Sequence, residues 1–186
     1  MPRFFRLQDD MTTDRRWYLS GPTGSLDEWL DDALVRGQEY LGGQPLKVAI
    51  VRPGPMLEVT FTTETIPIVN ERVAAMLRRT DRRNAQLIPA AVDGSSQLFF
   101  AVNVLPHPVC VDELASAPVV RWTEADGRPE MLGQYQRIGR LRLDAGRAGN
   151  WDLLRASEWP VAVIVSERLA DLLRAGNVRC NLMAVT

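Results

Sequence analysis

The order of apolar and polar residues along this chain repeats one pattern twice. The stretch Ile68–Arg78 (IVNERVAAMLR) returns as Ile164–Arg174 (IVSERLADLLR). In each copy an apolar run ends at Asn70 or Ser166, N-cap residues whose side-chain oxygen can accept from a free N–H of the first helical turn. Apolar residues then recur at i, i+3 and i+4, as on one face of an amphipathic helix. A further apolar stretch follows each helix, so the sequence predicts two similar strand-helix-strand units, at about 66–92 and 160–185.

The rest of the chain reads mostly as short strands separated by turn residues. A helix is expected to begin at Ser25, which lies three residues before Glu28 as in a capping box, and to end near Gly37. The expected strands are 3–7, 17–19, 46–51, 57–61, 97–105, 119–123 and 138–143, the last of them a half-exposed edge strand. We therefore expect an α+β fold in a single domain, 1–186, with a mixed, mostly antiparallel sheet and a few helices on one face of it.

Length, charge and hydropathy limit the kinds of partner that we expect for this protein. The chain has 186 residues, enough for one buried core. Its formal net charge of -1 provides no field that would attract nucleic acid or an anionic membrane. The N-terminal residues lack the apolar core of a signal peptide, and no stretch is long enough to span a membrane. The sequence therefore predicts a cytoplasmic protein with neither nucleic acid nor membrane as a partner.

Residues that could support catalysis are few. His107 is the only histidine and stands between two prolines, where the usual geometric demands on a general base are hard to meet. Cys110 and Cys180 lie in apolar runs, which favours buried free thiols over a disulfide or a reactive thiolate. Glycine-rich phosphate loops in a strand-loop-helix context are absent. We expect a protein that is not an enzyme, with no catalytic residues, no metal site and no cofactor.

Two charged clusters each have a structural and a functional interpretation. The acidic cluster comprises Asp27, Glu28, Asp31 and Asp32. Its members lie one helical turn apart, which favours a solvated helix face over a hard-cation site. The basic cluster comprises Arg78, Arg79, Arg82 and Arg83 and follows the first repeat helix. Cations at that end complement the helix dipole, and the alternative is a docking patch for an anionic partner.

Several motifs together resemble one known family. They are Pro67–Arg72, Leu87–Pro89 with Phe99–Val104, Val109–Asp112 with Ser116 behind it, and Trp159–Pro160 through Val165–Glu167. In this order and conjunction they resemble the bacterial polymorphic-toxin immunity proteins of family eleven. The resemblance covers about residues 46–186, a family-like core, and leaves 1–45 as a variable N-terminal part. The chain departs from the family pattern in having Thr65-Ile66 where a glycine is usual and Asn70 where a serine is usual.

The resemblance implies a function. An immunity protein is made beside a toxin, binds that cognate toxin encoded nearby, and protects the producer and its kin by stoichiometric occlusion. The toxin-binding patch that we expect is the acidic helix with its aromatic anchor, Asp27, Glu28, Trp29, Asp31 and Asp32. Two alternatives remain: an interaction or regulatory module without a toxin, and an enzyme that detoxifies a toxin product, which would need Cys110, His107 and Asp112 to converge.

Overall fold

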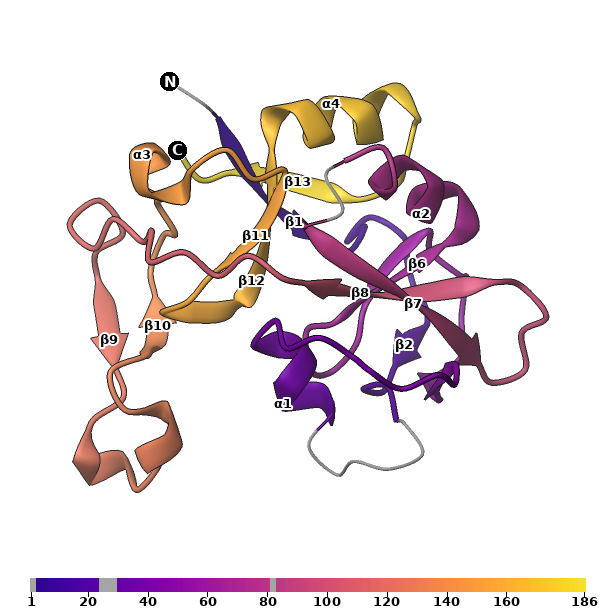
Figure 1. Cartoon of the computed structure of the whole chain (residues 1–186), viewed down its shortest axis with the longest axis horizontal. Helices are drawn as coiled ribbons and strands as arrows, with labels where there is room; N and C mark the ends of the chain where they lie inside the picture. Colours follow the sequence, from indigo (N-terminus) through magenta and orange to yellow (C-terminus); the bar gives the residue numbers. More distant parts are fainter. Residues whose placement is uncertain (1–2, 24–29, 81–82) are drawn as a thin grey trace.

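The computed structural model describes residues 3–23, 30–80 and 83–186 of the chain and has an α+β fold (Figure 1). The strands are β1 (Phe4–Gln8), β2 (Tyr18–Leu19), β3 (Leu46–Val48), β4 (Ile50–Arg52), β5 (Val59–Phe61), β6 (Pro67–Asn70), β7 (Ala85–Val92), β8 (Phe99–Val104), β9 (Val119–Arg121), β10 (Tyr135–Ile138), β11 (Leu153–Ala156), β12 (Trp159–Ser166) and β13 (Asn181–Ala184). The helices are α1 (Leu30–Val35), α2 (Glu71–Leu77), α3 (Ala145–Ala148) and α4 (Glu167–Ala175), with short 3-10 helices at Glu124–Asp126 and Pro129–Met131.

The strands form two main sheets, one for each repeat. The first repeat, β6-α2-β7, belongs to a sheet with the order β3-β7-β8-β6-β5. The second repeat, β12-α4-β13, belongs to a sheet with the order β11-β12-β1-β13. Two-stranded ribbons, β2 with β4 and β9 with β10, complete the pairing. The fold class is the expected one, but the strands are divided between two main sheets, and each repeat helix is associated with its own sheet.

Each repeat is completed by one strand from outside it. In the first sheet β8 lies between β6 and β7 and is antiparallel to both. In the second sheet β1 lies between β12 and β13 and is antiparallel to both. The two strands of each unit therefore run parallel to each other, with a third strand inserted between them. Because β8 follows its unit along the chain whereas β1 comes from the N-terminal end, the second unit is a circular permutation of the first.

Both repeat helices pack into one shared hydrophobic core. The inward side chains of α2 and α4 lie together in this core with apolar residues of both sheets. These helix residues are Val73, Ala74 and Leu77 of α2 and Leu169, Ala170 and Leu173 of α4. The outer face of the first sheet is covered by α1 and the β2–β4 ribbon, and that of the second by α3 and the β9–β10 hairpin (Figure 1). The N-cap side chains determine where the two helices start, and the apolar stripe determines how they are oriented.

The edge strand expected at 138–143 does not form. β10 ends at Ile138, and beyond it only Leu143 makes a bridge, to Val111. The N–H of Gly139 still donates to the carbonyl of Pro118 at 2.8 Å, next to the last β9–β10 pair, and the chain then bends at Gly139 and Arg140. Leu141 and Leu143 are buried in the core outside the second sheet. The prediction was wrong because alternating burial of leucines and arginines also occurs in a loop that packs against a core.

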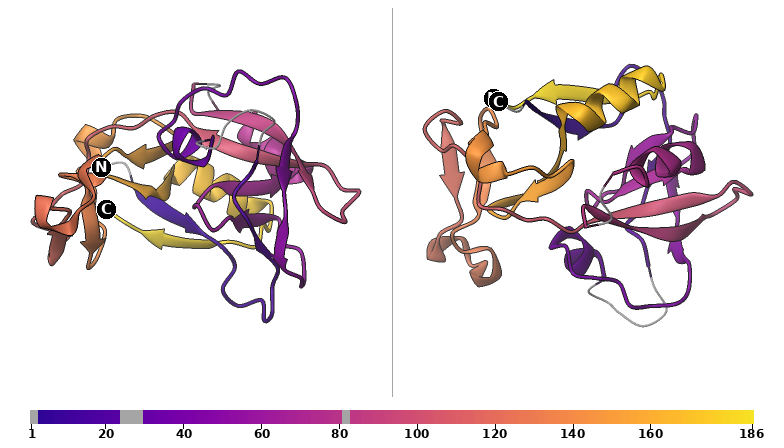
Figure 2. Two further views of the ribbon diagram at one scale, coloured as in Figure 1. Left: turned by 90° about the horizontal axis from the view of Figure 1, so that it is seen from below. Right: turned by 45° about the horizontal axis from the view of Figure 1, so that its top comes forward.

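A circularly permuted chain tests whether β1 and β8 have equivalent places in the two units. The N–H of Phe4 donates to Oγ1 of Thr186 at 3.1 Å, and the N–H of Val185 donates to the carbonyl of Phe4 at 3.0 Å, so the ends lie side by side (Figure 2). We expect a permutant joined by a short glycine linker and opened between the exposed Asp14 and Arg15 to keep a Tm within about 5 °C of the parent. Thermal denaturation followed by circular dichroism measures this. A permutant opened inside β8 is the control, and equal loss of folding in both would contradict the equivalence of β1 and β8.

Candidate functional site

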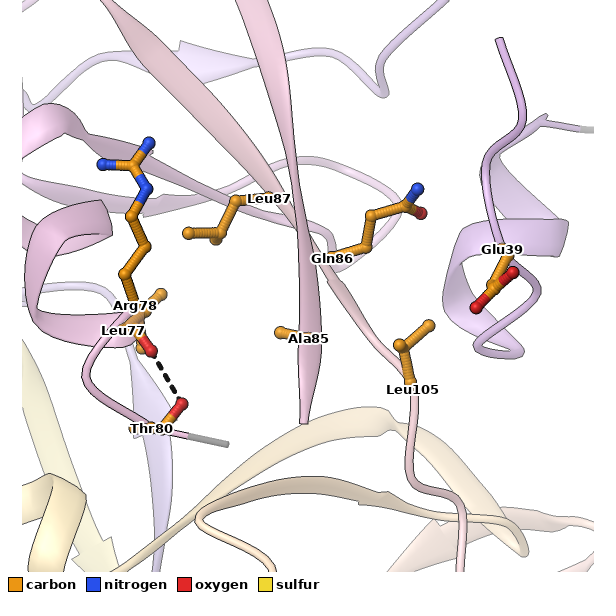
Figure 3. A pocket seen from close by; sticks show the side chains of 8 residues that line it. All are labelled: Glu39, Leu77, Arg78, Thr80, Ala85, Gln86, Leu87 and Leu105. Carbon is orange, nitrogen blue, oxygen red and sulfur yellow. Dashed lines mark hydrogen bonds between the residues drawn. The ribbon is translucent and has the colours of Figure 1, made fainter. Parts of the chain in front are cut away.

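One hollow in the described surface is a groove along the first residues of β7. It has a volume of about 450 Å³, within the range of ligand and side-chain pockets. It lies between the C-terminal end of α2 and the segment that follows α1 (Figure 3). The described residues that line it are Glu39, Leu77, Arg78, Thr80, Ala85, Gln86, Leu87 and Leu105. Leu77 and Leu87 line it on the side of Arg78, and Leu105 lines it on the side of Glu39, so apolar side chains lie between a guanidinium and a carboxylate (Figure 3).

One wall of the groove is the end of α2. Arg78 is the C-cap residue, and its N–H donates to the carbonyl of Ala74 at 3.0 Å. Its guanidinium lies over the ring of Phe100, 4.7 Å from the ring centre, a cation-π contact that holds the exposed side chain in place. Thr80 Oγ1 donates to the carbonyl of Leu77 at 2.7 Å and closes the last turn. The basic group on this wall is therefore held by local contacts of the helix end.

The other wall is the segment at Glu39, which a polar network fastens to the sheet. Gln86 accepts from the N–H of Tyr40 through Oε1 at 2.9 Å and donates to the carbonyl of Tyr40 through Nε2 at 2.7 Å. The buried Asn103 donates through Nδ2 to the carbonyl of Gln38 at 2.7 Å and to Gln86 Oε1 at 3.2 Å. This amide network fixes the position of Glu39 relative to β7. Asn103, the polar residue in the otherwise apolar β8, is therefore part of this network.

The basic cluster predicted from the sequence is divided by the structure. Arg78 lines the groove, whereas the exposed Arg79 lines a separate hollow beside α4. Arg83 lies over the ring of Trp151, with 5.8 Å between its guanidinium and the ring centre. Arg82 lies outside the described residues. The three described arginines of this cluster therefore lie in three different surroundings.

Only part of the expected acidic helix lies within the described residues. Asp27, Glu28 and Trp29 lie outside the described residues, and Asp31 is placed only as part of the backbone of α1. Asp32 is exposed, and its carboxylate accepts from Arg36 Nε at 2.8 Å, one helical turn away. A pair of this kind is typical of a solvated helix face. The toxin-binding role of these five residues stays a prediction.

The predicted cap residues make the expected type of bond. Asn70 Oδ1 accepts from the N–H of Val73 at 3.0 Å, and Ser166 Oγ accepts from the N–H of Leu169 at 3.2 Å. Each bond joins the cap to the third residue of its helix, and so satisfies one otherwise free donor of the first turn.

An ion pair accompanies each cap, and sequence reasoning missed both. Arg72 Nε donates to Glu58 at 2.7 Å, and Arg168 Nε donates to Asp152 at 2.9 Å. Burial alone would raise the pKa of Glu58, but the hydrogen bonds from Arg72 and Asn70 outweigh it and lower that pKa. The one sign of these ion pairs in the sequence was the arginine at the second helical position of both repeats. Nothing in the sequence pointed to the carboxylate partners, Glu58 and Asp152.

These two clusters also connect the repeats. Arg72 Nη1 donates to the carbonyl of Gly176, in the turn after α4. In the other direction, Asn84 Oδ1, in the turn after α2, accepts from the N–H of Asp152 at 2.9 Å. The turn after each helix therefore binds the cap region of the other unit, as expected for two copies related by approximate two-fold symmetry.

The three residues that an enzymatic mechanism would need are each engaged in local structure. The ring of His107 has Nε2 3.1 Å from the carbonyl of Val104, and burial lowers its pKa. Burial, reinforced by the nearby Glu158 carboxylate, raises the pKa of the Cys110 thiol to about 12. Asp112 Oδ1 accepts from the N–H of Ala115 at 3.0 Å, as in a turn. No hydrogen bond joins these three side chains to one another among the described residues.

Thiol reactivity tests this description of Cys110. Burial also raises the pKa of Cys180, to about 11, so at neutral pH both free cysteines are protonated. We expect Ellman's reagent to react slowly with the native protein near pH 7.5 and with both thiols after unfolding. A C110A variant, which retains only Cys180, assigns any residual reaction. A fast native reaction that disappears in C110A would contradict the buried, protonated thiol.

Neither a metal centre nor a membrane-crossing helix is found within residues 3–23, 30–80 and 83–186. That part of the chain has no group of three or more His, Cys, Asp or Glu side chains placed to hold a metal ion. None of its helices combines the length and apolar character needed to cross a membrane.

In comparisons with known proteins, no family model and no curated protein matches this sequence.

Proposed function

We propose that this protein is an immunity protein that binds a cognate toxin protein in the cytoplasm of the producing cell and blocks it by stoichiometric occlusion. The observation that carries the proposal is the groove at β7. Its apolar lining of Leu77, Leu87 and Leu105 is bordered by Arg78 and Glu39. An apolar centre with a charged rim is the usual composition of a protein-protein interface, and arginine is enriched among residues that dominate binding energy.

The sequence resemblance supports the same proposal. Its motifs fall on β6 and the start of α2, on β7, on β8, on β12 and the start of α4, and on the segment 109–116 between β8 and β9. Two of these elements, α2 and β7, form the groove. The resemblance to the immunity proteins of family eleven therefore concerns the elements that build the fold, and the side chains that line the groove would determine which toxin is bound.

The experiment is a titration of a toxin by the protein. The toxin domain encoded in the neighbouring upstream reading frame is expressed and assayed with increasing amounts of the protein. We expect protection to reach its limit at an equimolar ratio, because occlusion consumes one protein for each toxin. The R78E variant should bind at least about tenfold more weakly, whereas R137A, at an exposed position outside the groove, should bind as the parent does.

The alternatives give different results in the same titration. Protection that continues well below an equimolar ratio would indicate turnover, and with it an enzyme that acts on a toxin product. A variant that lacks both Cys110 and His107 but still folds and still protects would exclude that enzyme. No complex and no protection would contradict the proposed function and leave a module with another partner.

A further inference from the structure

The groove follows a strand edge that is only partly paired. β3 pairs with β7 only over Leu46–Val48, opposite Ala90–Val92. The first half of β7 is paired with β8 on one side, and on the other side it precedes the first residue of β3, which runs parallel to it. This uncovered half begins at Ala85, where the groove lies. An unpaired edge presents backbone donors and acceptors to any extended chain that reaches it.

The register identifies which backbone groups face the open edge. The N–H of Leu105 donates to the carbonyl of Asn84 at 3.1 Å, and residues on opposite strands alternate between bonded and non-bonded pairs. The even-numbered residues at the start of β7 therefore bond to β8. On the other side, the N–H of Asp93 donates to the carbonyl of Val48 at 3.0 Å, so the odd-numbered residues face the β3 edge.

Two residues of β7 consequently present their backbone to the groove. The N–H and C=O groups of Ala85 and Leu87 point to the open edge, and no described residue bonds to them on that side. Pro89 occupies the next odd-numbered position. A proline there removes no bond to β8, because the N–H at an odd-numbered position faces away from that strand.

Figure 3 looks onto this edge. The side chains of Ala85 and Leu87 lie on one side of β7, with Arg78, and the side chain of Gln86 lies on the other, with Glu39. Successive side chains of any added strand would also point to alternate sides. One side offers an arginine beside leucines, and the other offers a carboxylate beside an amide.

We propose that an extended segment of the bound protein adds to the open edge of β7 as an extra strand. For the identity of that protein, the toxin, the inference rests on the proposed function. Side chains on the α2 side of the added strand are apolar or acidic, facing Leu77, Leu87 and Arg78. Side chains on the other side include a base, which faces Glu39. Backbone hydrogen bonds to Ala85 and Leu87 supply affinity, and this alternation supplies specificity.

A second copy of this chain fits the same edge poorly. Two β7 edges paired antiparallel would keep each face of the sheet continuous across the pair. Arg78 of one copy would then share a face with Arg78 of the other, and the same holds for Glu39. Like charges brought together in this way are unfavourable, which favours a partner with the complementary pattern.

The first test uses a phage-displayed library of random 12-residue peptides as the probe. Selection is made on the parent protein, and the enriched peptides are then measured on L87P and L87A. The L87P variant removes the N–H at the open edge, as Pro89 already does two positions on, whereas L87A keeps that N–H and removes the side chain. We expect peptides with the alternating pattern, bound about tenfold more weakly by L87P than by L87A.

The second test needs no variant. Hydrogen exchange of the parent protein is measured residue by residue, alone and with the toxin domain. The amide of Leu87 should exchange fast in the free protein and at least about a hundredfold more slowly in the complex. The amide of Ile88, which bonds to β8, is the internal control and should be slow in both.

These results separate the two proposals. A toxin complex in which the Leu87 amide still exchanges fast would overturn strand addition and leave the immunity function standing. Peptides that bind the edge although no toxin is neutralised would overturn the immunity function and leave strand addition standing. The inference would be overturned if the library yields no peptide that depends on the Leu87 N–H. It would also be overturned if the protein forms a dimer in which that amide is protected.

Discussion

Deletion of residues 1–8 is expected to unfold the protein, although these residues are a small part of the chain. The deletion removes β1, which pairs with β12 on one side and with β13 on the other. It also removes Phe4, Phe5 and Leu7, all buried, from two of the hydrophobic clusters. At about 1.5–3 kcal/mol for each buried side chain, the loss is comparable to the total stability of about 5–15 kcal/mol of a typical domain.

Circular dichroism and an NMR amide spectrum check this expectation. As a control, the exposed tip of the β9–β10 hairpin, residues 124–131, is replaced by a short glycine turn, which should leave Tm nearly unchanged. A synthetic peptide of residues 1–8 should restore folded signals to the truncated chain. A truncated protein that melts at the parent's temperature would contradict the central role of β1.

Substitution of Arg155 by alanine is expected to be the most damaging change of a single charged residue. Its side chain is only 1% exposed. Nη2 donates to the carbonyl of Thr65 at 2.8 Å and Nη1 to the carbonyl of Pro160, so the guanidinium joins the loop before β6 to the start of β12. R155A would leave both carbonyls without this donor and open a cavity, a loss of about 3–5 kcal/mol in the free energy of unfolding.

Urea denaturation of three variants measures the effect. R155M restores most of the volume without the hydrogen bonds and should lose about 1–3 kcal/mol. R137A, at an exposed position, should stay within about 0.5 kcal/mol of the parent. Burial lowers the pKa of Arg155 to about 10, so the side chain stays charged at neutral pH and the loss should not vary there. A loss in R155A as small as that of R137A would contradict this role.

Local interactions made much of the fold predictable. The repeat helices are capped by Asn70 and Ser166 as the sequence indicates, and the strands at 4–8, 99–104 and 119–121 lie close to the expected ranges. Caps, apolar periodicity and turn residues act within a few positions of one another, so they can be read along the chain. Such signals were enough to predict the α+β class and the two similar units.

The candidate site was much less predictable. Arg78 appeared in the sequence as one of four basic residues, and nothing singled out Glu39 or Gln86. The groove exists because β3, which is parallel to β7, begins only opposite Ala90 and leaves the start of β7 uncovered, and strand pairing is a long-range property. For the same reason Arg155, between Leu154 and Ala156, carried no sign that its guanidinium would be buried against carbonyls from two distant segments.

The repeated unit, its capped helices and the fold class follow from the order of residues, because these features depend on residues close together in the chain. The insertion of β1 and β8 into the two sheets, and the half-open edge of β7, follow from the three-dimensional arrangement. Those features depend on which distant strands become neighbours. That choice is made by burial of apolar side chains across the whole molecule, and local propensity does not encode it.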